Sequence, residues 1–522
     1  MAIASEVHHI ALTLTDHLPI LQILIPFCTA PLIVFIGSKS LAWPMAFISS
    51  LLSLIIATTL LISVSDGNYI SYKLGGWVPP VGIEYRVDAT NAFILFLIAA
   101  TATVVLPFAF KSVNHEIPKR NHTLFYACFM LCITGLMGVV ITGDAFNVFV
   151  FLEISSLSTY VLVSQGSHRD KRALTAAYNY LIMGTLGATF FVIGIGFLYM
   201  TTGTLNMADM ADRLRGQGDN RTVQAAFAFI VVGMGLKAAM YPLHLWLPAA
   251  YKFAPSAVTT LLAATATKVA VYVIIRFMFT VFQPDYVFNS NILTWIIGPL
   301  AIFAMFAASL IAVFQTNFKR MLAYSSIAQI GYMMLGVAMF STTGLTATLV
   351  HMFNHGITKA ALFMGVGALM LRIGTTFYDR ISGMGRAMPL TGAAIVIGGL
   401  SLIGVPGTAG FISKWVLVQA AFEQHLWWLA LIIVASSLLA VIYVWRLIEV
   451  LYLQKPNSDV TLKEAPMLIV APMWVAAIAC LYFGLDTRFI LDAAATAAEG
   501  LMTGSAGMAE FSTATSIAAT DH

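Results

Sequence analysis

The sequence predicts an all-α polytopic membrane protein with about fourteen transmembrane helices. Of its 522 residues, 59% are hydrophobic and only 10% are charged, whereas charged residues make up about a quarter of an average soluble protein. Apolar stretches of about 20 residues, enough to cross a bilayer as a helix, recur along the chain between short polar loops. Strands of a membrane barrel would be shorter and would alternate in polarity, so the stretches favour helices.

The apolar stretches place the predicted spans in order along the chain. No basic segment precedes Leu18 and no small-residue cleavage site follows it, so the first stretch is expected to be a retained helix and not a signal peptide. After Asp486, residues 489–502 are expected to form a short surface helix and the remaining tail to be disordered. The predicted spans are 18–37, 44–64, 91–110, 123–142, 147–165, 178–200, 224–250, 256–282, 294–314, 323–341, 346–372, 389–417, 426–452 and 466–484.

The basic residues indicate how these helices are oriented. Loops after odd-numbered spans contain sixteen Lys or Arg residues, whereas the other loops and both termini contain six. Because cytoplasmic loops of membrane proteins are enriched in Lys and Arg, both termini are expected to face the outer side. The net charge of +4 is too small to indicate nucleic-acid binding.

Two of the predicted spans contain helix breakers at mid-depth. The seventh contains Pro242 and Pro248, and the twelfth contains Gly404, Pro406 and Gly407. A proline in a helix frees a carbonyl group, and the backbone there has to be buried in protein or hydrated. Broken helices at corresponding places of two halves indicate a transport site. Because the two helices are five apart, we expect two five-helix repeats, inverted relative to each other by their odd number of spans.

These repeats divide the chain into four predicted parts. Residues 1–122 would contain the first three helices, and residues 123–282 the first repeat with helices 4–8. Residues 283–452 would contain the second repeat with helices 9–13, and residues 453–522 the last helix and the tail. One helical bundle can use the whole chain, so the length does not require several globular domains.

Several ionisable residues lie inside the apolar spans. A charged side chain at mid-depth costs roughly 2.5–3.5 kcal/mol even on lenient scales, so its presence needs a compensating reason. The usual reason is a path for ions or protons, and a purely structural scaffold is the costlier alternative. The candidate pathway residues are Glu153, Lys237, His244, Lys268, His351, His355, Lys359 and Lys414.

Lys237 and His244 lie on either side of Pro242 in the seventh span. Being seven residues apart, they are expected to share one helix face at slightly different depths. A lysine whose carboxylate partner can move away would be a switchable proton carrier. Lys268 supplies a second basic group on the next helix, eight residues before Arg276, which we expect near the outer interface.

His351, His355 and Lys359 follow one another at intervals of four residues, which places them near one helix face. Two histidines at this spacing can bind a metal, but no Cys or acidic residue beside them completes a site. A titratable relay is therefore favoured over a metal site or over histidines bonded to hydroxyl and carbonyl groups. A shared haem is disfavoured, because ligands four apart on one helix cannot occupy its opposite faces. Lys414, after the broken twelfth helix, would be the last group of the relay.

Three segments of the sequence resemble a known family. They are residues 143–160 around Glu153, residues 237–256 in and after the seventh span, and the motif of His351, His355 and Lys359. These segments are similar to the antiporter-like subunits shared by respiratory complex I and Mrp-type multisubunit cation/proton antiporters. The phenylalanine-rich run 146–153 and the stretch 75–89 most resemble the D subunit of the Mrp antiporters. The resemblance covers roughly residues 70 to 485.

The resemblance implies a fourteen-helix fold with two inverted five-helix repeats and a polar axis along the middle of the membrane. The long lateral helix of the largest complex I subunit is expected to be absent, which argues against that type of chain and against the A subunit of the Mrp antiporters. The family's glutamate on the fifth helix, its lysines on the seventh, eighth and twelfth, and its histidines on the eleventh match Glu153, Lys237, Lys268, Lys414, His351 and His355.

The expected function is that of one subunit of a secondary antiporter, not an enzyme, that exchanges Na⁺ or another monovalent cation for protons. Its partners would be the other subunits of a hetero-oligomeric complex, the lipids of a bacterial cytoplasmic membrane, protons and monovalent cations, with no nucleic acid and no cofactor. Glu153 would be the counter-ion of Lys237, and Lys414 the exchange point with one side. The alternative is a proton-pumping subunit of a redox-driven complex, such as a complex I-like NADH-quinone oxidoreductase or a membrane-bound hydrogenase.

Overall fold

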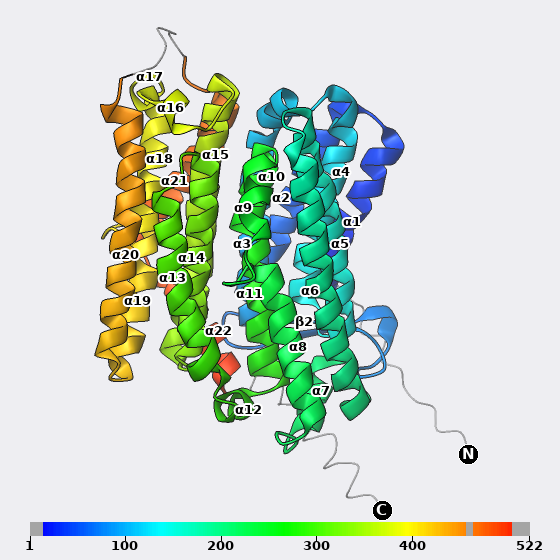
Figure 1. The fold of residues 1–522 in the computed structure, drawn as a ribbon. Coiled ribbons are helices and arrows are strands. Elements are labelled where there is room, and N and C mark those ends of the chain that lie inside the picture. The colour runs from blue at the N-terminus through cyan, green and yellow to red at the C-terminus, as the bar shows by residue number, and fades with distance from the viewer. Residues whose placement is uncertain (1–13, 456–462, 504–522) are drawn as a thin grey trace, which may run out of the picture.

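Helices that run side by side make up most of the structure (Figure 1). The computed structural model describes residues 14–455 and 463–503. Within these residues, thirteen helices are long and apolar enough to cross a membrane. A fourteenth segment consists of the shorter apolar helix α18 (Pro389–Ile403) and, after a break, α19 (Ala409–Glu423). The predicted all-α polytopic fold is therefore confirmed; the predicted disorder of the last residues lies outside the described ones.

The first six spans are uninterrupted helices that begin and end near the predicted residues. Side-chain caps fix the start of two of them: Asp88 accepts a hydrogen bond from the backbone N–H of Asn91, and Asp144 accepts one from that of Asn147. These six helices are α1 (Leu18–Ile36), α2 (Lys39–Ser63), α3 (Ala89–Glu116), α4 (His122–Ile141), α5 (Ala145–Ser164) and α6 (Arg172–Thr202).

The later spans contain the breaks. The predicted interruptions of the seventh and twelfth spans are observed, and the eighth span is also interrupted, at Thr265. The eighth, ninth and thirteenth spans each include a π-helical turn, at Phe277–Val281, Leu293–Ile297 and Glu449–Leu453. The helices of these spans are α8 (Arg221–Ala238), α9 (Trp246–Phe253), α10 (Ser256–Ala264), α11 (Ala266–Arg276), α13 (Gly298–Val313), α14 (Phe318–Ala338), α15 (Thr342–Ile373), α20 (Trp427–Ile448) and α21 (Met467–Leu485).

Short elements in the loops were not predicted. In the loop between α2 and α3, β1 (Ile70–Lys73) pairs antiparallel with β2 (Glu84–Val87). The short helices α7 (Met207–Leu214) and α12 (Pro284–Asn289) lie at the lower end of the molecule in Figure 1, and α16 (Tyr378–Ile381) and α17 (Met384–Ala387) at its upper end. These segments are too short to produce an apolar stretch of membrane-spanning length, which is why the sequence did not reveal them.

The helices of the two predicted repeats pack in the same order. In the first repeat α4 contacts α5 and α11, and in the second α13 contacts α14 and α20. Likewise α6 packs along α8 and α9, and α15 packs along α18 and α19. This correspondence supports two five-helix repeats, while the boundaries 123–282 and 283–452 stay a prediction.

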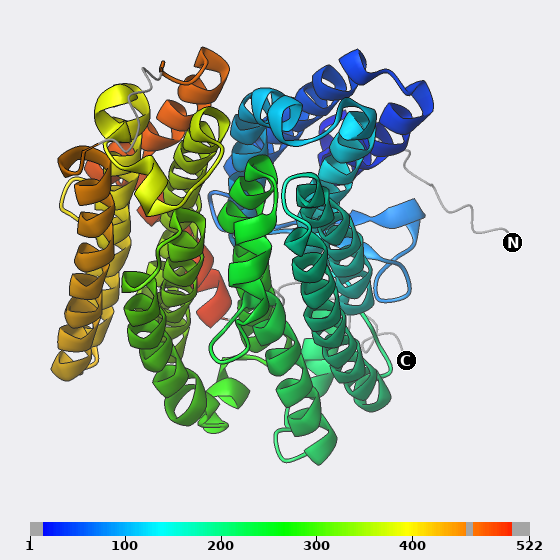
Figure 2. The same ribbon diagram turned by 45° about the horizontal axis from the view of Figure 1, so that its top comes forward.

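The two repeats meet where α10 packs on α15, and α3 lies against both helices. α15 contacts both α3 and α10, and α3 also contacts α21. Figures 1 and 2 show the helices α13, α14 and α20 on one side of this seam and α4, α5 and α6 on the other. The last helix, α22 (Arg488–Met502), confirms the predicted short helix and packs on α3 and α15. The row of ionisable residues on α15 therefore lies in the interior of the bundle.

Candidate ion pathway

Glu153 and Lys237 approach each other between α5 and the end of α8. Glu153 Oε1 lies 3.6 Å from Lys237 Nζ, a separation suited to an ion pair but too long for a hydrogen bond. Lys237 donates its hydrogen bond to Ser156 Oγ instead, at 2.7 Å. The Lys237 side chain is 8% exposed and that of Glu153 is 25% exposed. The two residues that we expected to pair are therefore neighbours, and the carboxylate is the more open partner.

The chain leaves the helix directly after Lys237. α8 ends at Ala238, and Ala239 adopts a left-handed conformation with φ of 57°. Lys237 therefore lies in the last turn of α8, where free carbonyl groups and the helix dipole favour a cation. The expectation that His244 shares a helix face with Lys237 is wrong, because the segment around Pro242 between them is not helical. His244 instead stacks on Tyr241, with ring centroids 4.9 Å apart.

Of the predicted helix breakers, one does not break a helix. Pro248 lies in the first turn of α9, where a backbone N–H has no partner in the helix and a proline is tolerated. Pro406 and Gly407 lie in the break between α18 and α19, and Gly404 ends α18 with φ of 91°. The positive φ is a conformation that glycine adopts without strain, which explains why the chain can turn sharply there.

Lys268 and Lys414 contact the carbonyl ends of two broken helices. Lys268 Nζ donates to Ala263 O, in the last turn of α10, across the interruption at Thr265. Lys414 Nζ donates to Ile403 O at 2.7 Å and to Leu402 O at 3.3 Å, at the end of α18. Both lysines are buried. Each ammonium group thus satisfies carbonyl groups that the break leaves free, at the negative end of a helix dipole.

His351, His355 and Lys359 form a row on α15, as their spacing predicted. The two imidazole rings are parallel, with centroids 6.0 Å apart. His351 Nδ1 is hydrogen-bonded to Ser413 Oγ at 2.7 Å, and Lys359 Nζ donates to Leu322 O at 2.7 Å. Among the described residues, neither ring nitrogen of His355 has a hydrogen-bond partner. The row therefore combines one histidine with a hydrogen-bond partner, one histidine without a described partner, and a lysine that donates to a backbone carbonyl and to the Ser325 hydroxyl.

The pathway lysines are compensated in two different ways. In the part of the chain that the structure describes, Lys237 is the one pathway lysine with a carboxylate at ion-pairing distance, and its partner is Glu153. Lys268 and Lys414 donate to backbone carbonyl groups, and Lys359 donates to a backbone carbonyl and to the Ser325 hydroxyl. Across residues 14–455 and 463–503, no three His, Cys, Asp or Glu side chains gather where they could hold a metal ion.

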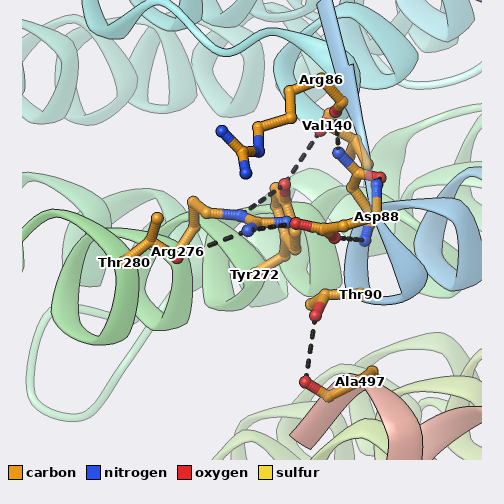
Figure 3. Close-up of polar contacts among 9 residues, drawn as sticks. Arg86, Asp88, Thr90, Val140, Tyr272, Arg276, Thr280 and Ala497 are labelled. Atoms are coloured by element: carbon orange, nitrogen blue, oxygen red, sulfur yellow. Dashed lines mark hydrogen bonds and ion pairs between the residues drawn. The ribbon is translucent and has the colours of Figure 1, made fainter. Parts of the chain in front are cut away.

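An ion pair at the far end of α11 was missing from the predicted site. The Nη1 and Nη2 atoms of Arg276 donate to the two carboxylate oxygens of Asp88, at 2.7 and 2.8 Å (Figure 3). Arg276 Nε also donates to the Tyr272 hydroxyl at 3.1 Å, and that hydroxyl donates to Val140 O at 2.9 Å. Asp88 and Arg276 are 188 positions apart in the sequence. Local spacing therefore gave no sign that they meet.

Known proteins resemble this chain in sequence over nearly its whole length. NADH-quinone oxidoreductase subunit N of Desulforudis audaxviator (strain MP104C) is 35% identical over 495 residues, which cover 92% of this chain and 98% of that protein. The D subunit of the Na(+)/H(+) antiporter of Bacillus subtilis (strain 168) is 28% identical over 486 residues, which cover 92% of this chain and 97% of that protein. The chain is thus similar to subunits of two kinds of membrane complex.

The fold of this chain is also similar to that of a chain in a known membrane complex. A chain in the structure of the Mrp complex from Dietzia sp. DQ12-45-1b superposes with a TM-score of 0.87 and 26% sequence identity, covering 95% of this chain and 99% of that chain. Residues 142–440 match the family described as NADH:quinone oxidoreductase/Mrp antiporter, TM, and this range includes every predicted pathway residue from Glu153 to Lys414. The match covers more than half of the chain, which therefore belongs to the NADH:quinone oxidoreductase/Mrp antiporter family of transmembrane proteins.

Proposed function

We propose that this chain is a subunit of a multisubunit antiporter that exchanges a monovalent cation, Na⁺ in the first place, for protons across a bacterial cytoplasmic membrane. The observation on which the proposal rests is the loose pair of Glu153 and Lys237, whose charged atoms are 3.6 Å apart. A lysine can release its proton, and a carboxylate that is not hydrogen-bonded to it can move away. The similarity to the D subunit of an antiporter and to a chain of an Mrp complex supports antiport.

In this proposal the pathway runs from the first repeat into the second. A proton leaves Lys237 Nζ for a neighbouring water molecule when Glu153 moves away, and the return of Glu153 favours the protonated lysine. His244 carries the path towards α14, since its ring lies 6.5 Å from that of Tyr324 and its Nδ1 has no hydrogen-bond partner among the described residues. The remaining basic groups then take up and release the proton in turn: Lys268, His351, His355, Lys359 and Lys414.

The position of Glu153 implies that another chain of the complex covers this edge of the molecule. Phe146, Val150 and Leu157 share its face of α5 and are exposed. A partly exposed carboxylate among apolar side chains is costly if lipid covers it. We therefore place another subunit of the complex against α5, where it shields Glu153 and continues the polar path.

The basic loops orient the chain in this proposal. The end that contains α16 and α17, at the top of Figure 1, also contains the basic loops and faces the cytoplasm, and both termini face the outer side. Labelling with a membrane-impermeant thiol reagent tests this orientation. A cysteine in place of Lys171 should be labelled in everted vesicles and protected in intact cells, and the opposite pattern would reverse the orientation.

The transport test uses everted vesicles that contain the whole complex, with no electron donor added. Addition of Na⁺ to vesicles energised by ATP hydrolysis should release the proton gradient in the wild type. Lys237→Ala and Glu153→Gln should abolish or strongly reduce this release in complexes that assemble normally. Wild-type exchange in Glu153→Gln vesicles would refute the role of the pair.

The second candidate function is proton pumping in a redox-driven complex. It is favoured by one observation, the 35% identity to a protein named NADH-quinone oxidoreductase subunit N. If wild-type vesicles show no cation-dependent exchange but acidify when an electron donor is added, the redox-driven pump replaces the antiporter. Loss of that acidification in Lys237→Ala vesicles would then show that the same residues serve it.

A further inference from the structure

A basic pocket lies at the upper end of the molecule, where the two repeats meet. Its volume is about 290 Å³. The first repeat contributes Arg169 and Arg172 from the start of α6 and Lys252 from α9, and the second repeat contributes Lys319 from α14. The carboxylates in its lining are Glu116 and Asp170. The pocket therefore has two more cationic side chains than carboxylates.

Both carboxylates are occupied by groups of the protein. Glu116 accepts hydrogen bonds from the Ser256 backbone N–H at 3.1 and 3.2 Å and from the Ser112 hydroxyl at 2.7 Å. Asp170 accepts hydrogen bonds from the Arg172 guanidinium, the shortest of them 2.6 Å. Asp170 therefore pairs with Arg172, and Glu116, which its neutral donors leave negatively charged, lies at ion-pairing distance from Arg169, so two cations of the pocket stay without a carboxylate partner.

Three cationic groups of the pocket make no hydrogen bond to a carboxylate. Lys252 Nζ lies over the rings of Phe253 and Phe377, at 5.0 and 5.4 Å, and makes no ion pair with a described residue. Arg169 donates to Gly374 O and is 3.8 Å from Glu116, a distance that allows an ion pair but is too long for a hydrogen bond. Lys319 is buried and donates one hydrogen bond, to Ala254 O at 2.9 Å. Aromatic rings and backbone carbonyls position these groups without cancelling their charge.

We propose that this pocket binds a phosphate group, either that of an anionic lipid or that of a free phosphate compound. A phosphate oxygen accepts strong charge-assisted hydrogen bonds from Lys and Arg, and the volume accommodates the group with a substituent attached. The bound anion bridges Arg169 and Lys252 of the first repeat to Lys319 of the second. It thereby ties the two repeats together at the face that carries most of the basic loops. The inference does not depend on whether the complex is driven by cations or by electrons.

The test is binding to the purified complex in nanodiscs. One arm compares phosphatidylcholine nanodiscs with nanodiscs that also contain phosphatidylglycerol, and counts the retained lipid by native mass spectrometry. The other arm titrates inorganic phosphate and pyrophosphate into phosphatidylcholine nanodiscs and records the melting temperature, with chloride at equal ionic strength as reference. Retention of phosphatidylglycerol identifies a lipid headgroup, and a shift with the inorganic anions identifies a free phosphate; either result supports the pocket.

Matched variants decide whether the anion binds in the pocket. Lys252→Gln should weaken binding about tenfold, which is the effect expected of one lost charge-assisted hydrogen bond. Lys171→Gln removes the same charge at the position before Arg172, but Lys171 does not line the pocket, so this variant should bind like the wild type. Lys252→Arg keeps the charge and should restore binding, which separates a lost ligand from a misfolded protein. No binding in either arm, or equal weakening by Lys252→Gln and Lys171→Gln, would overturn the proposal.

Discussion

Two ion pairs in this protein are built in opposite ways. Asp88 and Arg276 make two parallel hydrogen bonds of 2.7 and 2.8 Å, and their side chains are 9% and 7% exposed. Glu153 and Lys237 make no hydrogen bond at their separation of 3.6 Å, and the carboxylate is 25% exposed. Both pairs join segments far apart in the sequence. Only in the Asp88–Arg276 pair are the two side chains held together by direct hydrogen bonds.

The basic residue in each pair, arginine in one and lysine in the other, matches this difference in hydrogen bonding. Arginine stays protonated in proteins and fits a carboxylate with two parallel hydrogen bonds, so Arg276 fastens the start of α3 to the end of α11. Lysine carries a single ammonium group that can lose its proton, and Lys237 already divides its contacts between Glu153 and Ser156. The comparison indicates that a tight arginine pair holds the structure, whereas a loose lysine pair can take part in transport.

The largest effect should follow from breaking the tight pair. Arg276→Met leaves the Asp88 carboxylate buried without its cation, and removing one partner of a buried pair costs about 3–5 kcal/mol. Little assembled complex should be recovered from membranes, as measured by copurification of the other subunits. The double variant Asp88→Asn with Arg276→Met removes both charges while an amide can still cap α3, so it should restore most of the assembly. If Arg276→Met assembles normally, the pair is not a structural fastening.

A smaller and different effect should follow from stiffening the loose pair. Lys237→Arg keeps a positive charge beside Glu153 but cannot release a proton. The complex should assemble at the wild-type level, while cation-dependent proton exchange in everted vesicles should fall at least about tenfold, equivalent to roughly 1.4 kcal/mol. Arg276→Lys is the matched control, because it should lower assembly while leaving exchange per assembled complex unchanged. Near-normal exchange by Lys237→Arg would show that proton release from this position is not needed.

The features that could be predicted from the sequence are those that a short segment of the chain indicates by its own residues. Apolar length located the membrane spans, and Pro242 and Gly404 marked the breaks in the seventh and twelfth. The interval of four residues placed His351 beside His355 on one face of α15, as the parallel rings confirm. The cost of buried charge identified Glu153 and Lys237 as candidates, and the structure places them together.

The features that escaped prediction depend on the tertiary structure. The interruption at Thr265 has no Pro or Gly within α10 or α11 to announce it. The backbone carbonyls that hold Lys268 and Lys414 have no residue-specific signature, since every residue supplies one. The pairing of Asp88 with Arg276 joins positions 188 residues apart. The shared helix face predicted for Lys237 and His244 failed because the spacing rule assumes a continuous helix.

The smallest effect is a change of melting temperature at acidic pH, and it concerns the pair of Asp88 and Arg276. Burial by itself would raise the pKa of Asp88, but the charge and hydrogen bonds of Arg276, together with the Asn91 backbone N–H, hold that pKa below its ordinary value of 3.8. The contribution of a carboxylate with a lowered pKa is complete above the ordinary value and is lost as the pH falls through the lower, folded-state value. The melting temperature of the purified complex should therefore show no contribution from Asp88 titration between about pH 8 and pH 5, and the pair's stabilisation should disappear only below about pH 4.

The double variant Asp88→Asn with Arg276→Met is the reference for this measurement, because it lacks both charged partners. Subtracting its melting curve from that of the wild type at each pH should leave a difference that is constant near neutrality and shrinks only in strong acid. A difference that already shrinks between about pH 7 and pH 5 would mean that Asp88 takes up a proton in the range where transport occurs. Asp88 and Arg276 would then resemble Glu153 and Lys237 in function, and the tight geometry alone would no longer distinguish a fastening from a pathway.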